Sequence, residues 1–94
     1  MTREDIALLV PGKALNELIA QECGEGLVVG RTYNPSARIE HAWPLVIKYQ
    51  LSIRPMASKQ WVCIGRHESS FRETPEHTIC ECALLCELFE VKKK

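Results

Sequence analysis

The sequence predicts an α+β domain in which helices pack against a small antiparallel sheet. Two observations support this fold class. Segments with apolar residues three and four positions apart, typical of helices, occupy both ends of the chain. Between them lie two short runs typical of strands, with room for a third at 71–73. The predicted order is roughly α-α-β-β-(β)-α, after a short N-terminal turn or helix.

The N-terminal part holds two of these helical segments. Thr2 is suited to cap a first turn or helix, because two acidic residues follow at its positive end. Pro11 suits the first turn of a second helix, which Gly24 can end. The apolar face of that helix consists of Ala14, Leu15, Leu18 and Ile19. Residues 24–33 are expected to form an irregular connection, and the sequence leaves open whether they contain a strand.

A further helix is predicted to run from Ser36, as its N-cap, through Tyr49. Its expected inner face consists of Ile39, Ala42, Trp43, Val46 and Tyr49. Pro44 lies inside this helix, where it removes a backbone donor and clashes with the preceding turn, at a cost of about 3 kcal/mol. We therefore expect a kink or a break near Trp43, and the sequence leaves open which of the two occurs.

Two strands are predicted at Leu51–Met56 and Gln60–Arg66, joined by a connection of hairpin length. The run Trp61–Ile64 is apolar at every position, which is typical of a strand covered on both faces. Pro55 favours an edge position for the first strand, because proline cannot donate to the ladder of hydrogen bonds.

The last predicted helix begins at Thr74, an N-cap followed by Pro75 at the first helical position. At 100° per residue, one broad arc faces the predicted sheet and consists of Ile79, Cys82, Ala83, Leu85, Cys86 and Phe89. A second apolar stripe, on another side of the helix, consists of Cys80, Leu84, Leu88 and Val91. An N-terminal helix or a second chain would cover this stripe, and we expect it to be a self-association surface.

The cysteines of this helix raise the alternative of a metal or redox site. A metal needs three or four ligands that converge, but Cys80 points away from Cys82 and Cys86. His77 lies three residues before Cys80, and two ligands do not form a site. No C-x-x-C pair is present. We therefore interpret the cysteines as small core residues and expect no metal, cofactor or catalytic residue.

Length and hydropathy predict one soluble domain, residues 1–91, with a disordered basic tail at 92–94. No apolar run approaches the roughly 18 residues that cross a membrane, so no membrane partner is expected. The N-terminus lacks the features of a secretory signal peptide. We expect a cytoplasmic protein with reduced thiols.

The net charge of zero is unevenly distributed. Residues 26–72 hold seven basic and two acidic residues, which leaves nucleic-acid binding through this region open as an alternative function. Glu73 and Glu76, at the start of the last helix, would repel phosphate. We therefore rank nucleic acid behind a protein partner.

Four stretches of the chain are "MTREDIALLVPGKALNELIAQ", "NPSARIEHAWPLVIKY", "QWVCIG" and "ETPEHTICECALLCEL". Together they resemble the phage ABA-sandwich domain family, small proteins of double-stranded DNA phages and prophages. The resemblance implies an α/β/α sandwich, with helices packed on both faces of a small antiparallel sheet, and it implies no catalytic or binding residue. Pro44 departs from the family pattern. The expected function is that of a phage or prophage accessory protein in the bacterial host cytoplasm, non-enzymatic and acting through protein contacts with another protein or as a homo-oligomer.

Overall fold

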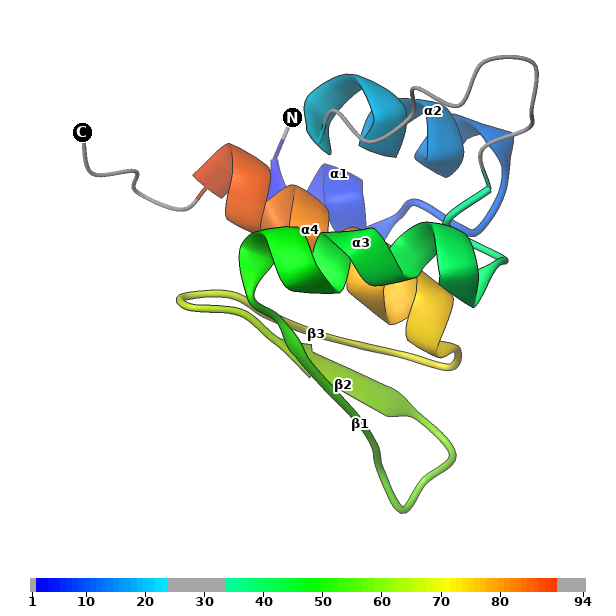
Figure 1. The fold of residues 1–94 in the computed structure, drawn as a ribbon, viewed down its shortest axis with the longest axis vertical. Helices are drawn as coiled ribbons and strands as arrows, with labels where there is room; N and C mark the ends of the chain where they lie inside the picture. The colour runs from blue at the N-terminus through cyan, green and yellow to red at the C-terminus, as the bar shows by residue number, and fades with distance from the viewer. Residues whose placement is uncertain (1, 24–33, 90–94) are drawn as a thin grey trace.

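The structure is a computed structural model that describes residues 2–23 and 34–89. Its elements are α1 (Arg3–Ala7), α2 (Lys13–Cys23), α3 (Ile39–Tyr49), β1 (Ser52–Pro55), β2 (Trp61–Ile64), β3 (Ser69–Arg72) and α4 (Pro75–Phe89). The α+β class and the predicted order of elements are confirmed (Figure 1). The predictions for residues 24–33 and for the tail at 92–94 lie outside the described residues. None of the described helices is long and apolar enough to cross a bilayer.

The three strands form an antiparallel sheet in the order β1-β2-β3. In the β1–β2 hairpin the amide of Met56 donates to the carbonyl of Gln60 (2.7 Å). Since hydrogen-bonded pairs alternate along an antiparallel ladder, the backbone of Pro55 then points away from β2. The proline therefore costs no ladder bond, and the predicted edge position of the first strand is confirmed.

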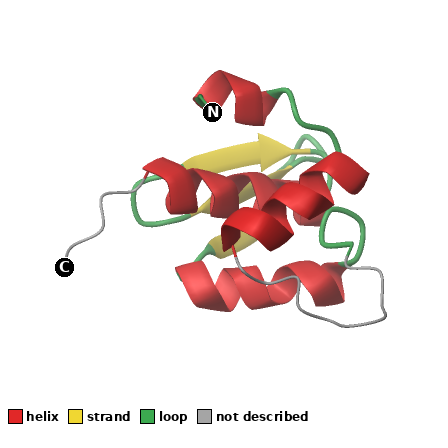
Figure 2. Ribbon diagram, turned by 90° about the horizontal axis from the view of Figure 1, so that it is seen from above, coloured by secondary structure: helices red, strands yellow, loops and turns green. Residues whose placement is uncertain are grey.

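Helix α4 forms the centre of the fold. It lies across the strands, with α1 on one side, α3 on the other and α2 in front (Figure 2). Nine consecutive residues, Thr78–Cys86, are buried. A helix that is buried all round needs cover on every side, and the sheet and the three other helices supply it.

All four helices lie on the same side of the sheet (Figures 1 and 2). In this respect the arrangement of layers differs from the expected sandwich, because no described helix covers the second face. On that face Ile64 and Phe71 are exposed, whereas Cys63 on the inner face is fully buried against α4. The apolar run of β2 predicts a strand that is packed against other elements on both faces. In the described part of the chain, helices pack on only one of these faces.

The predicted cap of α1 is confirmed. The hydroxyl oxygen of Thr2 accepts from the amide of Asp5 (3.1 Å), and the Asp5 carboxylate accepts from the amide of Thr2 (2.8 Å). Hydrogen bonding to the backbone of Thr2 first, and then to the Thr2 side chain, lowers the pKa of the Asp5 carboxyl. An ion pair between Arg3 and Glu68 (2.7 Å) joins α1 to the loop that precedes β3.

The prediction of Ser36 as an N-cap is wrong. Helix α3 begins at Ile39, and the Ser36 hydroxyl is buried in contact with the segment around α2. It donates to Oδ1 of Asn16 (2.7 Å) and accepts from the amide of Gly12 (3.0 Å). Asn16 can therefore be buried, because its polar atoms have hydrogen-bond partners.

Of the two outcomes expected near Trp43, a kink or a break, the break does not occur, since α3 is continuous from Ile39 to Tyr49. Pro44 is the sixth residue of the helix, so the one intrahelical bond it removes is that to the carbonyl of Glu40. Its ring is exposed and leaves the core contacts undisturbed. The buried side of α3, which packs on α4, consists of Ala42, Leu45 and Val46.

Candidate interaction surface

The cysteines singled out by the sequence are core residues. All five are free thiols and all five are buried. The Sγ atom of Cys82 faces the carbonyl of Cys63 on β2 (3.6 Å), as expected for a side chain directed at the sheet. Among residues 2–23 and 34–89, no group of three or more His, Cys, Asp or Glu side chains could hold a metal ion. The interpretation of these cysteines as small hydrophobic residues is confirmed by their burial.

Three of these thiols also have raised pKa values. Burial raises the pKa of Cys23 to about 11, and it raises the pKa of Cys80 above its ordinary value. Hydrogen bonding to the side chain of Cys63 raises the pKa of Cys82 to about 12. The thiolate is the nucleophile and the metal ligand, so these three side chains are in the unreactive form near neutral pH.

The predicted self-association stripe does not form a surface. Cys80 and Leu84 are fully buried, and Leu88 is half-buried against the core. Val91 lies outside the described residues. The hypothesis of a second chain at this stripe is therefore wrong for Cys80 and Leu84, because the chain's own helices cover them. A helical projection identifies an apolar stripe, but it does not identify what covers the stripe.

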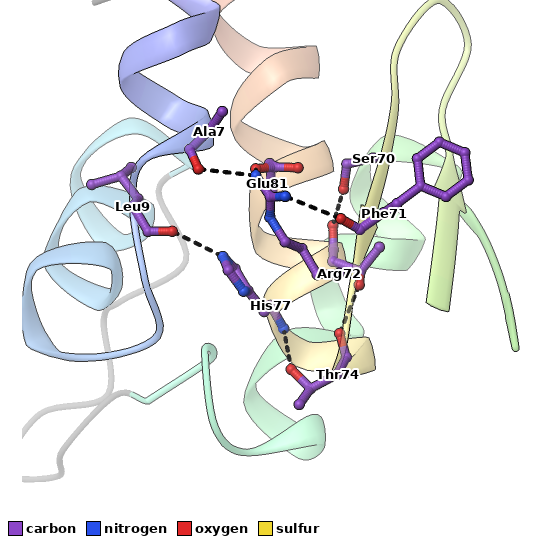
Figure 3. Close-up of polar contacts among 9 residues, drawn as sticks. Ala7, Leu9, Ser70, Phe71, Arg72, Thr74, His77 and Glu81 are labelled. Carbon is purple, nitrogen blue, oxygen red and sulfur yellow. Dashed lines mark hydrogen bonds and ion pairs between the residues drawn. The ribbon is translucent and has the colours of Figure 1, made fainter. Parts of the chain in front are cut away.

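A cluster of polar contacts joins β3 and the segment after α1 to α4 (Figure 3). Arg72 donates to the carboxylate of Glu81, whose side chain is only 8% exposed, and to the carbonyl of Ala7. The Nε2 atom of His77 lies 3.0 Å from the carbonyl of Leu9. Burial lowers the pKa of His77. Because these side chains bind the backbone and a carboxylate of the protein itself, we infer that the cluster stabilises the fold.

This cluster orients the neighbouring side chain as well. Arg72 is directed to α4, and the ring of Phe71 points away from it on the opposite side of β3 (Figure 3). Phe71 is 49% exposed, a large fraction for a phenylalanine in a sheet. The ion pair of Arg72 is thus made from the face of β3 that points to α4, and the Phe71 side chain lies on the opposite face, exposed to solvent.

Phe71 belongs to a surface that we name the open sheet face. Strand register places Arg54, Val62 and Phe71 in one row across the sheet, and Ser52, Ile64 and Ser69 in the next. A hollow of about 370 Å³ lies on this face. It is lined by Arg54, Pro55, Met56, Val62, Ile64 and Phe71. Concave apolar surfaces with one or two placed polar groups are typical of binding sites.

Arg54 is the only charged residue in the two rows of the open sheet face. It forms no ion pair with another described residue. An exposed cation at the border of an apolar hollow can bind a carboxylate, and the apolar residues beside it can take up apolar side chains. The face therefore has the chemistry of a protein-binding surface.

A second exposed apolar surface lies on α3, and we name it the α3 stripe. It consists of Ile39, Trp43 and Ile47, which follow one another at four-residue spacing. Ile39 is 41% exposed and Trp43 is 47% exposed, so the prediction of these two residues on the inner face is wrong, and Ile47 is 68% exposed. The apolar arc of α3 is wider than the side that α4 covers.

Neither surface was predicted from the sequence, although the sequence contains a signal for each. The apolar run Trp61–Ile64 indicates a strand that needs cover on two faces. The spacing of Ile39, Trp43 and Ile47 indicates a stripe along one side of a helix. Neither signal says whether the cover lies within the chain.

Comparisons of the chain with protein-family models, with curated proteins and with solved structures each found no match. The resemblance to the phage family therefore stays a prediction.

Proposed function

We propose that this chain is a non-enzymatic accessory protein that acts through protein–protein contacts, and that its binding surface is the open sheet face. The observation that carries the proposal is that Ile64 on β2 and Phe71 on β3 are exposed beside an apolar hollow, although the apolar run of β2 is typical of a strand covered on both faces. Contiguous exposed apolar side chains of this kind mark interaction sites on soluble domains.

The four sequence stretches that resemble the phage family support placing this accessory role in a phage or prophage, within the cytoplasm of the bacterial host. The raised pKa values of Cys23, Cys80 and Cys82 and the engagement of His77 and Arg72 with the protein itself support a role without catalysis.

The open sheet face supports a protein partner better than a nucleic acid. Nucleic-acid affinity comes largely from several Lys or Arg contacts with phosphate, and this face carries one cation, Arg54. Stacking of bases needs aromatic side chains, and in these two rows Phe71 is the only one.

A binding experiment tests the proposal. The wild-type protein is immobilised and compared with the variant Ile64→Ser/Phe71→Ser for retention of proteins from a bacterial lysate, after nuclease treatment. The matched control is Leu8→Ser/Val10→Ser, which alters two exposed apolar residues that belong to neither the sheet nor α3. We expect the sheet variant to lose the retained proteins and the control to keep them.

Equal retention by the sheet variant and the control would contradict the proposal. A loss of all retention on nuclease treatment, together with binding of DNA or RNA that weakens from 50 to 200 mM salt, would support the nucleic-acid alternative instead.

A further inference from the structure

We infer that the open sheet face binds the α3 stripe of a second copy of this chain, so that copies join head to tail. This inference rests on the proposed function, because it names the partner of the same surface. It follows from two exposed apolar surfaces on one chain that match each other in form, in length and in charge.

The two surfaces cannot meet within one copy. Helix α3 packs on α4 and lies on the helical side of the sheet, whereas the open sheet face is directed away from all four helices (Figure 1). The contact between them must therefore be made between two copies. A helix placed on the open sheet face would supply the second helical layer that the apolar run of β2 predicts.

The surfaces match in form and length. From Ile39 to Ile47 the stripe is eight helical steps long, which is about 12 Å at 1.5 Å per residue. Strands of four residues, such as β2, are about 13 Å long. Three strands are about 14 Å wide, which accommodates one helix of about 10 Å diameter. Trp43, at the middle of the stripe, is the side chain we assign to the hollow beside Phe71.

The charges match as well. Glu40 is the only acidic residue of α3, and it lies about 60° around the helix from Trp43, so it borders the stripe. Lys48 lies about 140° from Trp43, on the far side. The present partner of Glu40 is Arg38 (3.2 Å), in an exposed pair of the kind that contributes little. Docking places Glu40 opposite Arg54, the one cation of the open sheet face.

A face-to-face dimer of two sheets is less favourable. It would bring two copies of Arg54 together on a surface about 13 Å long and 14 Å wide, where neither row contains an acidic residue. The helix of a second copy covers the same apolar residues and brings the missing carboxylate.

A head-to-tail contact leaves one open sheet face and one α3 stripe free at the two ends of an open assembly. Such a contact continues into a chain of copies, or it closes into a ring in which no end is free. The contact area is far below the roughly 800 Å² per partner of a standard interface, so we expect weak association, roughly in the 100 µM range.

Two variants and their mixture test the inference by sedimentation velocity between about 10 µM and 1 mM, the range in which a weak contact is populated. The sheet variant, Ile64→Ser/Phe71→Ser, keeps an intact α3 stripe. The helix variant, Trp43→Ser/Ile47→Ser, keeps an intact open sheet face. We expect the average mass of the wild type to rise with concentration and each variant alone to stay monomeric. An equimolar mixture should form a dimer and nothing larger, because its two members have one functional contact between them.

Charge reversal provides a second test that leaves the apolar residues in place. Arg54→Glu should weaken association at least threefold, and so should Glu40→Lys. The double variant Glu40→Lys/Arg54→Glu should recover wild-type association, because the two reversed charges face each other. The control Leu8→Ser/Val10→Ser should associate as the wild type does. Circular dichroism confirms that each variant is folded.

The inference is overturned if the folded wild type stays monomeric up to 1 mM, if either apolar variant still associates alone, or if the mixture stays monomeric. Absence of recovery in the charge double variant overturns it as well. A monomeric wild type that still retains another protein through Ile64 and Phe71 would leave the proposed function standing without this inference. A wild type that neither self-associates nor retains another protein would contradict both the inference and the proposed function.

Discussion

A β-carbon on Gly65 would lie 2.7 Å from the Sγ atom of Cys86, because the backbone that follows β2 runs directly against α4. Real β-carbons essentially never approach other heavy atoms so closely, so any other residue at this position requires the Cys86 side chain or the backbone around it to shift. The relationship fixes how close α4 lies to the end of the central strand.

We expect Gly65→Ala to lower the free energy of unfolding by about 1–3 kcal/mol, the usual cost of overpacking a core, as measured by urea denaturation. In a Cys86→Ala background the same substitution should cost less, because the atom nearest the new methyl group is gone. If the losses in free energy of unfolding of the two single variants simply add in the double variant, Cys86 does not limit how closely α4 approaches Gly65.

Removal of the Arg72 guanidinium should destabilise the fold through Glu81. The Glu81 side chain is 8% exposed, and Arg72→Met leaves its carboxylate without a cation in a buried position. We expect Arg72→Met to lower the free energy of unfolding by about 2–3 kcal/mol, discounted from a fully buried pair because Arg72 is 29% exposed. The double variant Arg72→Met/Glu81→Leu should recover part of this loss, since no unpaired charge remains. A double variant as unstable as the sum of its two single variants would contradict this account.

Stability should fall with pH below 6.5 because of His77. Burial lowers its folded-state pKa below the ordinary value of 6.5, so in that range the unfolded chain binds more protons than the native protein. The free energy of unfolding therefore rises as pH rises from the folded-state pKa to 6.5 and is constant above it, as far as this group is concerned. We expect the free energy of unfolding, measured by urea denaturation at pH 5 to 7.5, to rise less steeply with pH in His77→Gln than in the wild type. His67→Gln, at an exposed turn position, should keep the wild-type slope, and a flattened slope there would point to another cause.

The five thiols should be slow to react with a thiol reagent such as dithionitrobenzoate at pH 8. All are buried, and the raised pKa values of Cys23, Cys80 and Cys82 keep these three protonated at that pH. Unfolding in urea should release all five to rapid reaction, which the absorbance of the released thionitrobenzoate counts. Rapid reaction of any thiol in the native protein would contradict the burial described above.

The features that the sequence predicted correctly depend on local chemistry. The cap at Thr2, the start of α4 after Thr74 and the edge position of Pro55 each follow from a few adjacent residues. The burial of the cysteines follows from the apolar character of α4 over its whole circumference.

The features that it missed depend on contacts between distant segments. Ser36 is buried because Asn16, twenty positions away, accepts from its hydroxyl. The apolar arc of α3 is wide enough for either Trp43 or Leu45 to face the core, and only the position of α4 decides that Leu45 does. In the same way, the pattern of β2 states a need for cover without stating which molecule provides it. For this reason the proposed binding surface could not be predicted from local sequence patterns.

The position of α4 along the chain has a consequence for biosynthesis. The helices before it and the sheet all pack on α4, yet α4 follows every one of them in the order of translation. While residues up to Glu73 are leaving the ribosome, the nascent chain has apolar helix and strand surfaces but not the helix that joins them. Folding of this domain must then wait until α4 has been released, and until that moment the exposed segments are substrates for ribosome-associated chaperones and for proteolysis.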